Sequence, residues 1–298
     1  MSHDLVERLR ALQPKSKFFI GIDSDGCVFD TMEIKQKQCF HPVIIRHWNF
    51  EAIAPYVRET AQFVNLYSRW RGTNRFPALD MTFDLLRQRP EVQQSGVDVP
   101  ELTSLKRWMR EESRLGNPAL EAKVKESGDP ELEKILEWSL EVNRTIEEVV
   151  HGVESFDFVR ESLNKAGRRA DLLVVSQTPL EALEREWKEH AMDGLVAMIA
   201  GQEHGTKTEH LEYAASGKYA KDHILMIGDA PGDLKAAQAN DALFYPVLPG
   251  EETRSWEKFY REGLDRFFEG TYAGAYQEER IEEFDRRLPS VPPWSKSS

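Results

Sequence analysis

Short apolar runs of strand length recur along this sequence, and each is followed by polar or turn-forming residues. Continuous apolar runs of this length are typical of a parallel sheet that is covered on both faces. We expect strands at residues 18–22, 171–175, 195–200, 223–228 and 242–247, and helices between the later ones at residues 153–166, 180–190, 207–216 and 233–239. This alternation predicts an α/β fold, a doubly wound parallel sheet with right-handed crossovers.

The pattern changes between residues 31 and 150, where strand signals nearly vanish. Apolar residues at helical spacing predict helices at residues 56–70, 102–114 and 130–150. We therefore predict a core built from residues 1–30 and 151–250, an inserted all-helical cap at 31–150, and a C-terminal helical extension with a tail at 251–298.

Composition narrows the class of protein. The chain has 298 residues and a formal net charge of -12, which argues against non-specific binding to nucleic acid or to anionic membranes. No apolar run has the length of a transmembrane helix, and residues 1–17 lack the continuous apolar stretch of a signal peptide. With Cys27 and Cys39 as the only cysteines, no disulfide framework is indicated. We expect a cytoplasmic protein, and the sequence leaves its oligomeric state open.

Polar residues with chemical potential follow the predicted strands. In open α/β sheets ligands bind at the carboxyl ends of the strands, so we expect these residues to converge there: Asp23, Asp25, Ser176, Lys207, Asp229 and Asp233. Clustered carboxylates repel one another unless a cation neutralises them, and hard oxygen ligands suit Mg²⁺. Carboxylates, a hydroxyl and a lysine are also the groups that phosphoryl transfer requires.

A simpler interpretation exists for several of these residues. Asp229 and Asp233 would stabilise the N-terminus of the following helix without a metal. Ser176 would serve equally well at the end of a strand. Lys218 and Lys221 lie close enough in the sequence to compete with Lys207 for its role.

Four segments of the chain together resemble the four motifs of the haloacid dehalogenase (HAD) superfamily. They are Asp23-Ser-Asp25-Gly26, Ser176, Lys207 and Gly228-Asp229-Ala-Pro-Gly-Asp233, each in the expected order after its strand. The resemblance implies a Rossmann-like core, and it implies that the helical insertion after the first motif is a cap of the C1 type.

The resemblance also implies a role for each motif residue. Asp23 would be the nucleophile that forms an aspartyl-phosphate, and Asp25 the general acid and base. Ser176 and Lys207 would bind the phosphoryl group.

A magnesium ion would take the Asp23 carboxylate, the Asp25 carbonyl and Asp229, with Asp233 supporting it through water or Lys207. Phosphatases and phosphomutases of the superfamily have the acid at the position of Asp25, and its dehalogenases typically lack it. A dehalogenase is therefore not expected.

We predict an enzyme, a Mg²⁺-dependent phosphoric monoester hydrolase that acts on a small phosphorylated metabolite. A phosphomutase with the same intermediate is an alternative, as is a non-catalytic module that binds phosphate or metal. The presence of Asp25 argues against the non-catalytic module, which would not need an acid there.

Substrate recognition is expected in the cap, where positive charge gathers in an otherwise acidic protein. Arg69, Arg71, Arg75 and His47 are candidates for binding a substrate anion. The alternative is that these residues belong to a solvated helix face. The tryptophans Trp108, Trp138 and Trp187 are expected in the core.

Overall fold

The computed structural model describes residues 2–296 of the chain, with side chains from residue 4 to residue 295. The strands are β1 (Phe18–Ile22), β2 (Ala170–Val175), β3 (Met198–Ala200), β4 (Ile224–Gly228) and β5 (Leu243–Pro246). Contacts divide the chain into two compact units, one of residues up to 32 with 152–289, the other of residues 33–151 with those from 290 onward.

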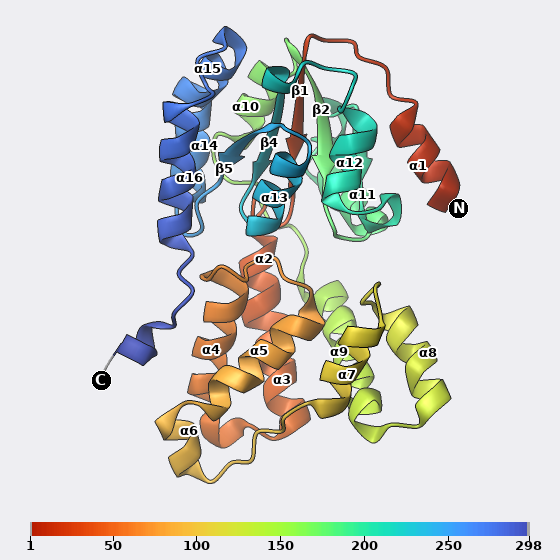
Figure 1. The fold of residues 1–298 in the computed structure, drawn as a ribbon, viewed down its shortest axis with the longest axis vertical. Coiled ribbons are helices and arrows are strands. Elements are labelled where there is room, and N and C mark those ends of the chain that lie inside the picture. The colour runs from red at the N-terminus through yellow and green to blue at the C-terminus, as the bar shows by residue number, and fades with distance from the viewer. Residues whose placement is uncertain (1, 297–298) are drawn as a thin grey trace. The chain divides into compact units, whose positions relative to one another are not determined.

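Helices make up most of the remaining chain (Figure 1). The α-helices of the first unit are α1 (Ser2–Arg10), α10 (Val159–Ala166), α11 (Leu180–Glu189), α12 (Lys207–Ala214), α13 (Pro231–Ala239), α14 (Glu252–Lys258), α15 (Leu264–Glu269) and α16 (Ala275–Arg287), and α2 (Thr31–Ile34) lies where the two units join in sequence. Those of the second unit are α3 (His41–Trp48), α4 (Ala54–Leu66), α5 (Arg75–Arg87), α6 (Pro90–Ser95), α7 (Thr103–Glu111), α8 (Asn117–Ser127) and α9 (Pro130–Val149). Two π-helical segments, η1 (Lys35–Phe40) and η6 (Phe259–Gly263), and short 3-10 turns join them.

The first unit is built on a five-stranded sheet in the order β3-β2-β1-β4-β5, and all neighbouring strands run parallel. This confirms the predicted α/β fold class. Ile22 at the end of β1 lies opposite Val174 on one side and Ile227 on the other. The residues that follow these three strands therefore emerge at the same edge of the sheet.

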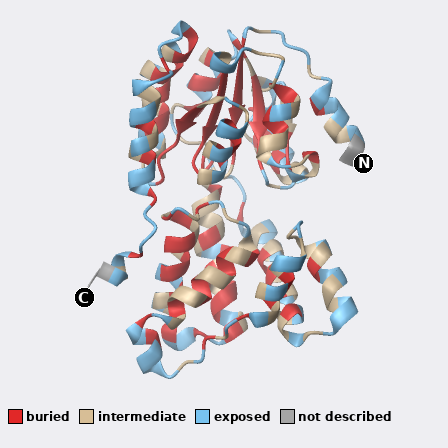
Figure 2. Ribbon diagram, in the orientation of Figure 1, coloured by how far each residue is buried: buried red, intermediate tan, exposed pale blue. Residues whose placement is uncertain are grey.

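Successive residues of a strand point to opposite faces of the sheet. All residues of β1 and β4 are buried, so both faces of the sheet are covered (Figure 2). Ile20 and Ile22 face a core cluster that includes α10, α11, α14 and α15. Phe19 faces the other way, into a cluster with α1, α12, α13 and α16. Two-sided burial explains why these strands are continuously apolar in the sequence.

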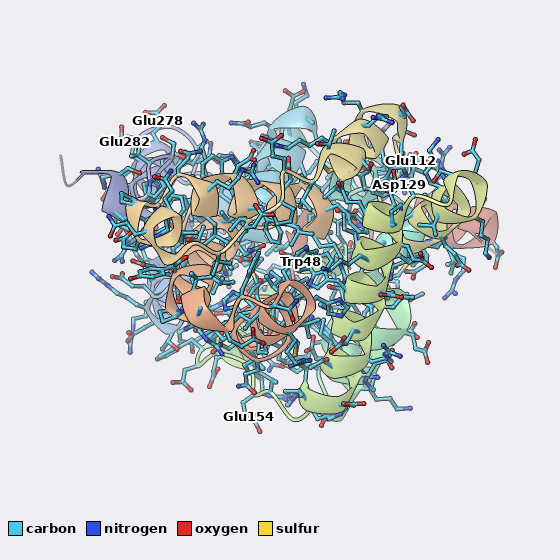
Figure 3. All side chains as sticks on the ribbon, turned by 90° about the horizontal axis from the view of Figure 1, so that it is seen from below. Trp48, Glu112, Asp129, Glu154, Glu278 and Glu282 are labelled. Atoms are coloured by element: carbon cyan, nitrogen blue, oxygen red, sulfur yellow. The ribbon has the colours of Figure 1, made fainter. Side chains whose placement is uncertain are left out.

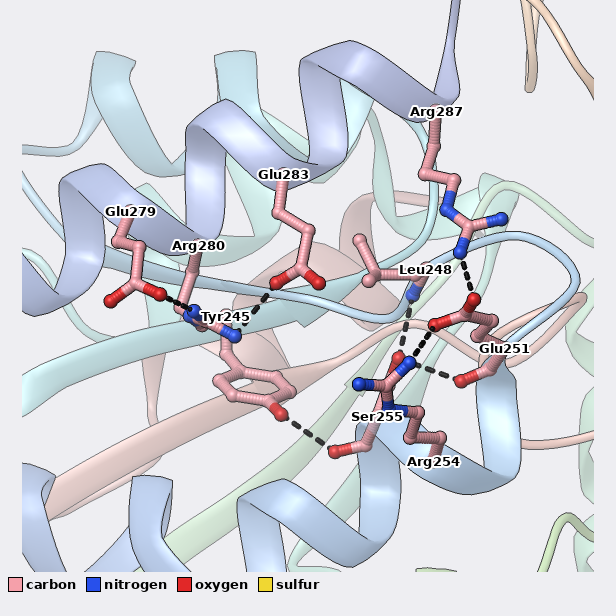
Figure 4. A network of polar contacts seen from close by, with 9 residues as sticks. All are labelled: Tyr245, Leu248, Glu251, Arg254, Ser255, Glu279, Arg280, Glu283 and Arg287. Carbon is pink, nitrogen blue, oxygen red and sulfur yellow. Dashed lines mark hydrogen bonds and ion pairs between the residues drawn. The ribbon is translucent and has the colours of Figure 1, made fainter.

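The C-terminal helices belong to the first unit and complete it beside β5. The Tyr272 hydroxyl donates to the Phe244 carbonyl over 2.8 Å, and the Phe244 amide donates to the Gln277 side chain over 2.9 Å. The Tyr245 hydroxyl donates to the Ser255 carbonyl over 2.6 Å, within the polar network drawn in Figure 4. These bonds fix α14 and α16 to the last strand.

The second unit is helical throughout its described residues and has its own core. Trp48, labelled in Figure 3, packs edge-on against Phe83 and Trp138 in that core. The long helix α9 is capped by Asp129, also labelled there, whose carboxylate accepts the first free amides of the helix. From the C-terminal segment, Trp294 packs against Phe63.

Most predicted elements are present, and the expected core tryptophans Trp108, Trp138 and Trp187 are buried. The predicted helix at 153–166 begins only at Val159, because Phe158 takes a left-handed conformation that a helix cannot contain. The predicted strand at 195–200 is shorter, since residues 193–195 form a 3-10 turn. Within the described residues, no helix is both long and apolar enough to cross a membrane.

A buried histidine in the first unit makes its stability depend on pH. His210 on α12 is fully buried, and burial, followed by the charges of His204 and Lys207, lowers its pKa to about 4. The unfolded chain therefore binds a proton below pH ~6.5 that the folded chain refuses. The free energy of unfolding therefore has its full value above this pH and falls as the pH drops toward 4. The total loss due to His210 is at most about 3 kcal/mol.

We expect His210→Leu to flatten the fall in unfolding free energy between pH 6.5 and 4.5, measured by urea denaturation. The exposed His151, changed to Leu, serves as the matched control and should keep the parent slope. If His210→Leu lost stability on acidification as steeply as the parent, the assignment of this pH dependence to His210 would be wrong.

Candidate active site

Backbone hydrogen bonds, one to β4 and the others within the turn, fix the turn after β1. The Asp23 amide donates to the Ile227 carbonyl on β4 over 2.9 Å. The Ser24 carbonyl accepts from the amides of Val28, Cys27 and Phe29 at 2.8 to 3.2 Å. Gly26 has a φ of 80°, a conformation that favours glycine. The chain thus reverses tightly, directly after it has placed Asp23 at the edge of the sheet.

Three buried carboxylates meet at this edge. One oxygen each of Asp23, Asp229 and Asp233 lies within 4.8 Å of the other two. Asp23 is 4% exposed and the other two are fully buried, so water screens their mutual repulsion poorly. Buried carboxylate oxygens in this number are hard ligands that fit a divalent metal ion.

Lys207 supplies the positive charge of the cluster. Its ammonium group lies 2.7 Å from Asp23 Oδ2 and 2.6 Å from Asp233 Oδ1. A reciprocal cap between Thr206 and Glu209 starts α12 at this residue and so fixes where its side chain begins.

The competing lysines are engaged elsewhere. Lys218 donates to the carbonyls of Arg10 and Leu12, and Lys221 pairs with Asp241. Of the three lysines, Lys207 is the one that contacts the carboxylates of the cluster.

The charged groups of the cluster shift one another's pKa. Burial raises the pKa of Asp23 well above its usual range; Lys207 opposes this shift, whereas Asp233 and Asp229 reinforce it. Burial also disfavours the Lys207 ammonium, but Asp23 and Asp233 outweigh it and raise the pKa of that group. Three carboxylates and one ammonium carry a net charge of −2 when all are ionised, the charge that a divalent cation would neutralise.

Asp25 is half-buried, whereas the three clustered carboxylates are buried. Its side chain is hydrogen-bonded by the Thr31 hydroxyl at the start of α2. Thr31 is fully buried, and the sequence gives no signal for it. The carboxyl group of Asp25 is therefore held in place by a residue that the sequence analysis missed.

Ser176 follows β2 at the same edge of the sheet and is buried. Its hydroxyl accepts the Thr178 amide over 3.2 Å, a contact that also fits the simpler role of ending the strand. Its neighbour Gln177 donates to the Gly205 carbonyl over 2.8 Å, which links this loop to the segment that carries Lys207.

Asp233 reaches the cluster only because β4 ends in glycine. A Cβ atom on Gly228 would lie 2.3 Å from Asp233 Cγ, a distance that atoms cannot occupy. Asp233 Oδ2 also accepts the Ala230 amide over 3.0 Å, at the start of α13. Both oxygens of Asp233 thus contact protein donors, one of them Lys207.

The four substrate candidates lie in the second unit. The buried Arg71 donates to the Leu66 carbonyl. Arg75 donates to Ser139 and Asn143, and burial lowers its pKa to about 10. His47 lies 2.5 Å from a Glu141 oxygen, and Arg69 is exposed. The contacts of Arg71 and Arg75 support the helices of this unit, and the role of all four in substrate binding stays a prediction.

Comparison with solved structures shows the fold. A candidate β-phosphoglucomutase from Bacteroides vulgatus has a TM-score of 0.51 and 13% identity over 91% of this chain and 98% of its own. A haloacid dehalogenase-like family hydrolase from Xanthomonas campestris has a TM-score of 0.45 and 10% identity, over 88% and 98% of the two chains. No protein-family model matches the sequence, and no curated protein is significantly similar to it.

In this chain the sheet has the order β3-β2-β1-β4-β5, and Asp23, Asp229 and Asp233 lie together beyond its strands. This protein therefore has the fold of the candidate β-phosphoglucomutase from Bacteroides vulgatus.

Proposed function

We propose that this protein is a Mg²⁺-dependent phosphatase that hydrolyses a small phosphorylated metabolite through an aspartyl-phosphate on Asp23. One observation carries the proposal: Lys207 joins Asp23 to Asp233 in a buried cluster of three carboxylates that also includes Asp229. A cluster of this kind is costly to maintain in a protein unless it binds a cation. A bound divalent cation would in turn attract a phosphate group.

The proposed reaction uses the two acids of the first turn. A carboxylate oxygen of Asp23 attacks phosphorus, the bond from phosphorus to the leaving oxygen breaks, and Asp25 gives that oxygen a proton. Water then attacks phosphorus, Asp25 takes a proton from it, and the bond to Asp23 breaks to release inorganic phosphate. The hydrogen bond from Thr31 supports this role, because it orients the Asp25 carboxyl group.

Asp23, the Asp25 carbonyl and Asp229 would hold the metal ion, with Asp233 acting through Lys207. The ion would neutralise charge on the phosphoryl oxygens. Lys207 and Ser176 would donate hydrogen bonds to the same oxygens, which stabilises the charge of the transition state.

Turnover of an aryl phosphate in Mg²⁺ tests the proposal. We expect Asp23→Asn to lower kcat by roughly 10³-fold or more, since it removes the nucleophile. Asp25→Asn should lower kcat by about 10²–10⁴-fold through loss of proton transfer. The exposed Asp222, changed to Asn, is the matched control and should keep the parent rate. Equal rates for Asp23→Asn and the parent would refute the mechanism.

Absence of turnover on a broad panel of phosphate esters would favour the non-catalytic alternative. The phosphomutase alternative, suggested by the name of the Bacteroides vulgatus protein, predicts an isomerised sugar phosphate when a sugar bisphosphate is added. Phosphorus NMR of the products separates these outcomes, because a phosphatase releases inorganic phosphate with or without the bisphosphate.

Metal binding has a readout that does not depend on turnover. At about one hundred times its Kd, Mg²⁺ should stabilise the folded protein by ~2.7 kcal/mol and raise its melting temperature. Asp229→Asn should lose most of this shift, whereas Asp222→Asn should retain it. A full Mg²⁺-induced shift in Asp229→Asn would contradict the assigned metal site.

Gly228→Ala tests the packing that places Asp233. The added methyl group has to displace the Asp233 side chain, so we expect a loss of about 1–3 kcal/mol in stability together with reduced turnover. Gly232, on the following helix, has open space around its Cβ position, and Gly232→Ala is the matched control. Chemical denaturation and the aryl phosphate assay measure both effects, and identical behaviour of the two variants would contradict the proposed constraint.

A further inference from the structure

A cavity in the first unit lies near the amino ends of the strands, whereas the acidic cluster lies at their carboxyl ends. It has a volume of about 360 Å³ and is lined by the end of α1, the segment after it, the first residues of the inner strands and the end of α12. Phe19 and Asp171, near the starts of β1 and β2, belong to its lining, whereas Asp23 follows the end of β1. A cavity of this volume is within the range of small-molecule sites.

The floor of this cavity is apolar. Phe19, Leu173 and Ala214 are almost completely buried beneath it, and the half-buried Leu12 and Met198 form its walls. Met198 lies on β3, a strand at the edge of the sheet. An apolar group bound here would cover Leu12 and Met198 and remove their exposed surface from water, which favours binding.

The rim of the cavity is positively charged. Arg8 and Lys15 are both exposed and both line it. Asp171 is the one acidic residue among the described lining residues, and its Oδ2 accepts the amides of Lys15 and Ser16 and the Tyr219 hydroxyl at 2.7 to 3.0 Å. That carboxylate holds the wall together and keeps its negative charge, so Arg8, Lys15 and Asp171 together give the rim a net charge of +1, which favours an anion.

Hydrogen bonds hold this wall in place. The Lys218 ammonium donates to the carbonyls of Arg10 and Leu12 at 2.7 and 2.9 Å, and so fixes the chain where α1 ends. Cations are favoured at the C-terminal end of a helix, where carbonyl groups lack partners. Because the wall is already ordered, a ligand would pay little conformational entropy to bind.

From these features we infer that the cavity binds a small amphipathic anion, a molecule with an apolar body and one carboxylate or sulfonate group. The apolar body occupies the floor over Phe19 and Ala214, and the anionic group lies at the rim near Arg8 and Lys15. This site is independent of the proposed phosphatase reaction, since none of its lining residues belongs to the acidic cluster.

Anilinonaphthalene sulfonate, a fluorescent aromatic anion, is a suitable probe for the full-length protein. We expect saturable binding at one site and displacement by octanoate. Octylammonium, which has the same chain length and the opposite charge, should not displace the probe. Displacement by both octyl compounds alike would show that charge plays no part and would overturn the inference.

Two variants locate the probe. Lys15→Glu should weaken binding by roughly fivefold, because it replaces an attractive charge with a repulsive one. Its matched control is Lys17→Glu. Lys17 is exposed, lies over the ring of Phe18 and does not line the cavity. Equal weakening by both changes would indicate a general charge effect and contradict the site.

Ala11→Trp tests the cavity directly, since Ala11 is an exposed lining residue whose enlargement fills the opening. We expect it to abolish probe binding while circular dichroism and melting temperature stay at parent values. Asp23→Asn should bind the probe as the parent does. Unchanged binding in Ala11→Trp, or lost binding in Asp23→Asn, would overturn the inference, because the probe would then lie elsewhere.

Discussion

The ammonium group of Lys207 is the charge on which the acidic edge of the sheet depends. It contacts Asp23, which follows β1, and Asp233 on α13. Asp233 lies 26 residues beyond Lys207 in the sequence. Without it, Asp23 and Asp233 would lose the cation that both of their carboxylates contact. The contact also ties α12 to the sheet at the point where the chemistry is proposed to occur.

Three local features of the backbone place the residues around this contact. The capping box at Thr206 sets where α12 begins, the glycine at position 228 leaves room for Asp233, and the turn at Gly26 returns the chain beside Phe29. Each device is local, yet all of them converge because parallel strands end at one edge. The site is therefore a property of the sheet topology as much as of its acidic residues.

The sequence predicted the sheet and the acidic cluster because both follow from short-range signals. Apolar runs mark the strands, and the topology of parallel sheets then brings Asp23, Asp229 and Asp233 together. Contacts between distant side chains carry no such signal. Thr31 beside Asp25, and the partners that occupy Arg75, became visible only in the folded chain. The start of α10 was misplaced because a left-handed Phe158 breaks a periodic pattern that the residue types alone support.

The hydrogen bonds at Phe244 have a consequence for how copies of this protein can associate. Strand β5 lies at one end of the sheet, and an edge strand ordinarily offers its free amides and carbonyls to a strand of another molecule. Here the side chains of Tyr272 and Gln277 already occupy the carbonyl and amide of Phe244. A strand of another molecule that paired with Phe244 would have to break these two bonds, so the chain's own side chains oppose strand addition at this end of the sheet.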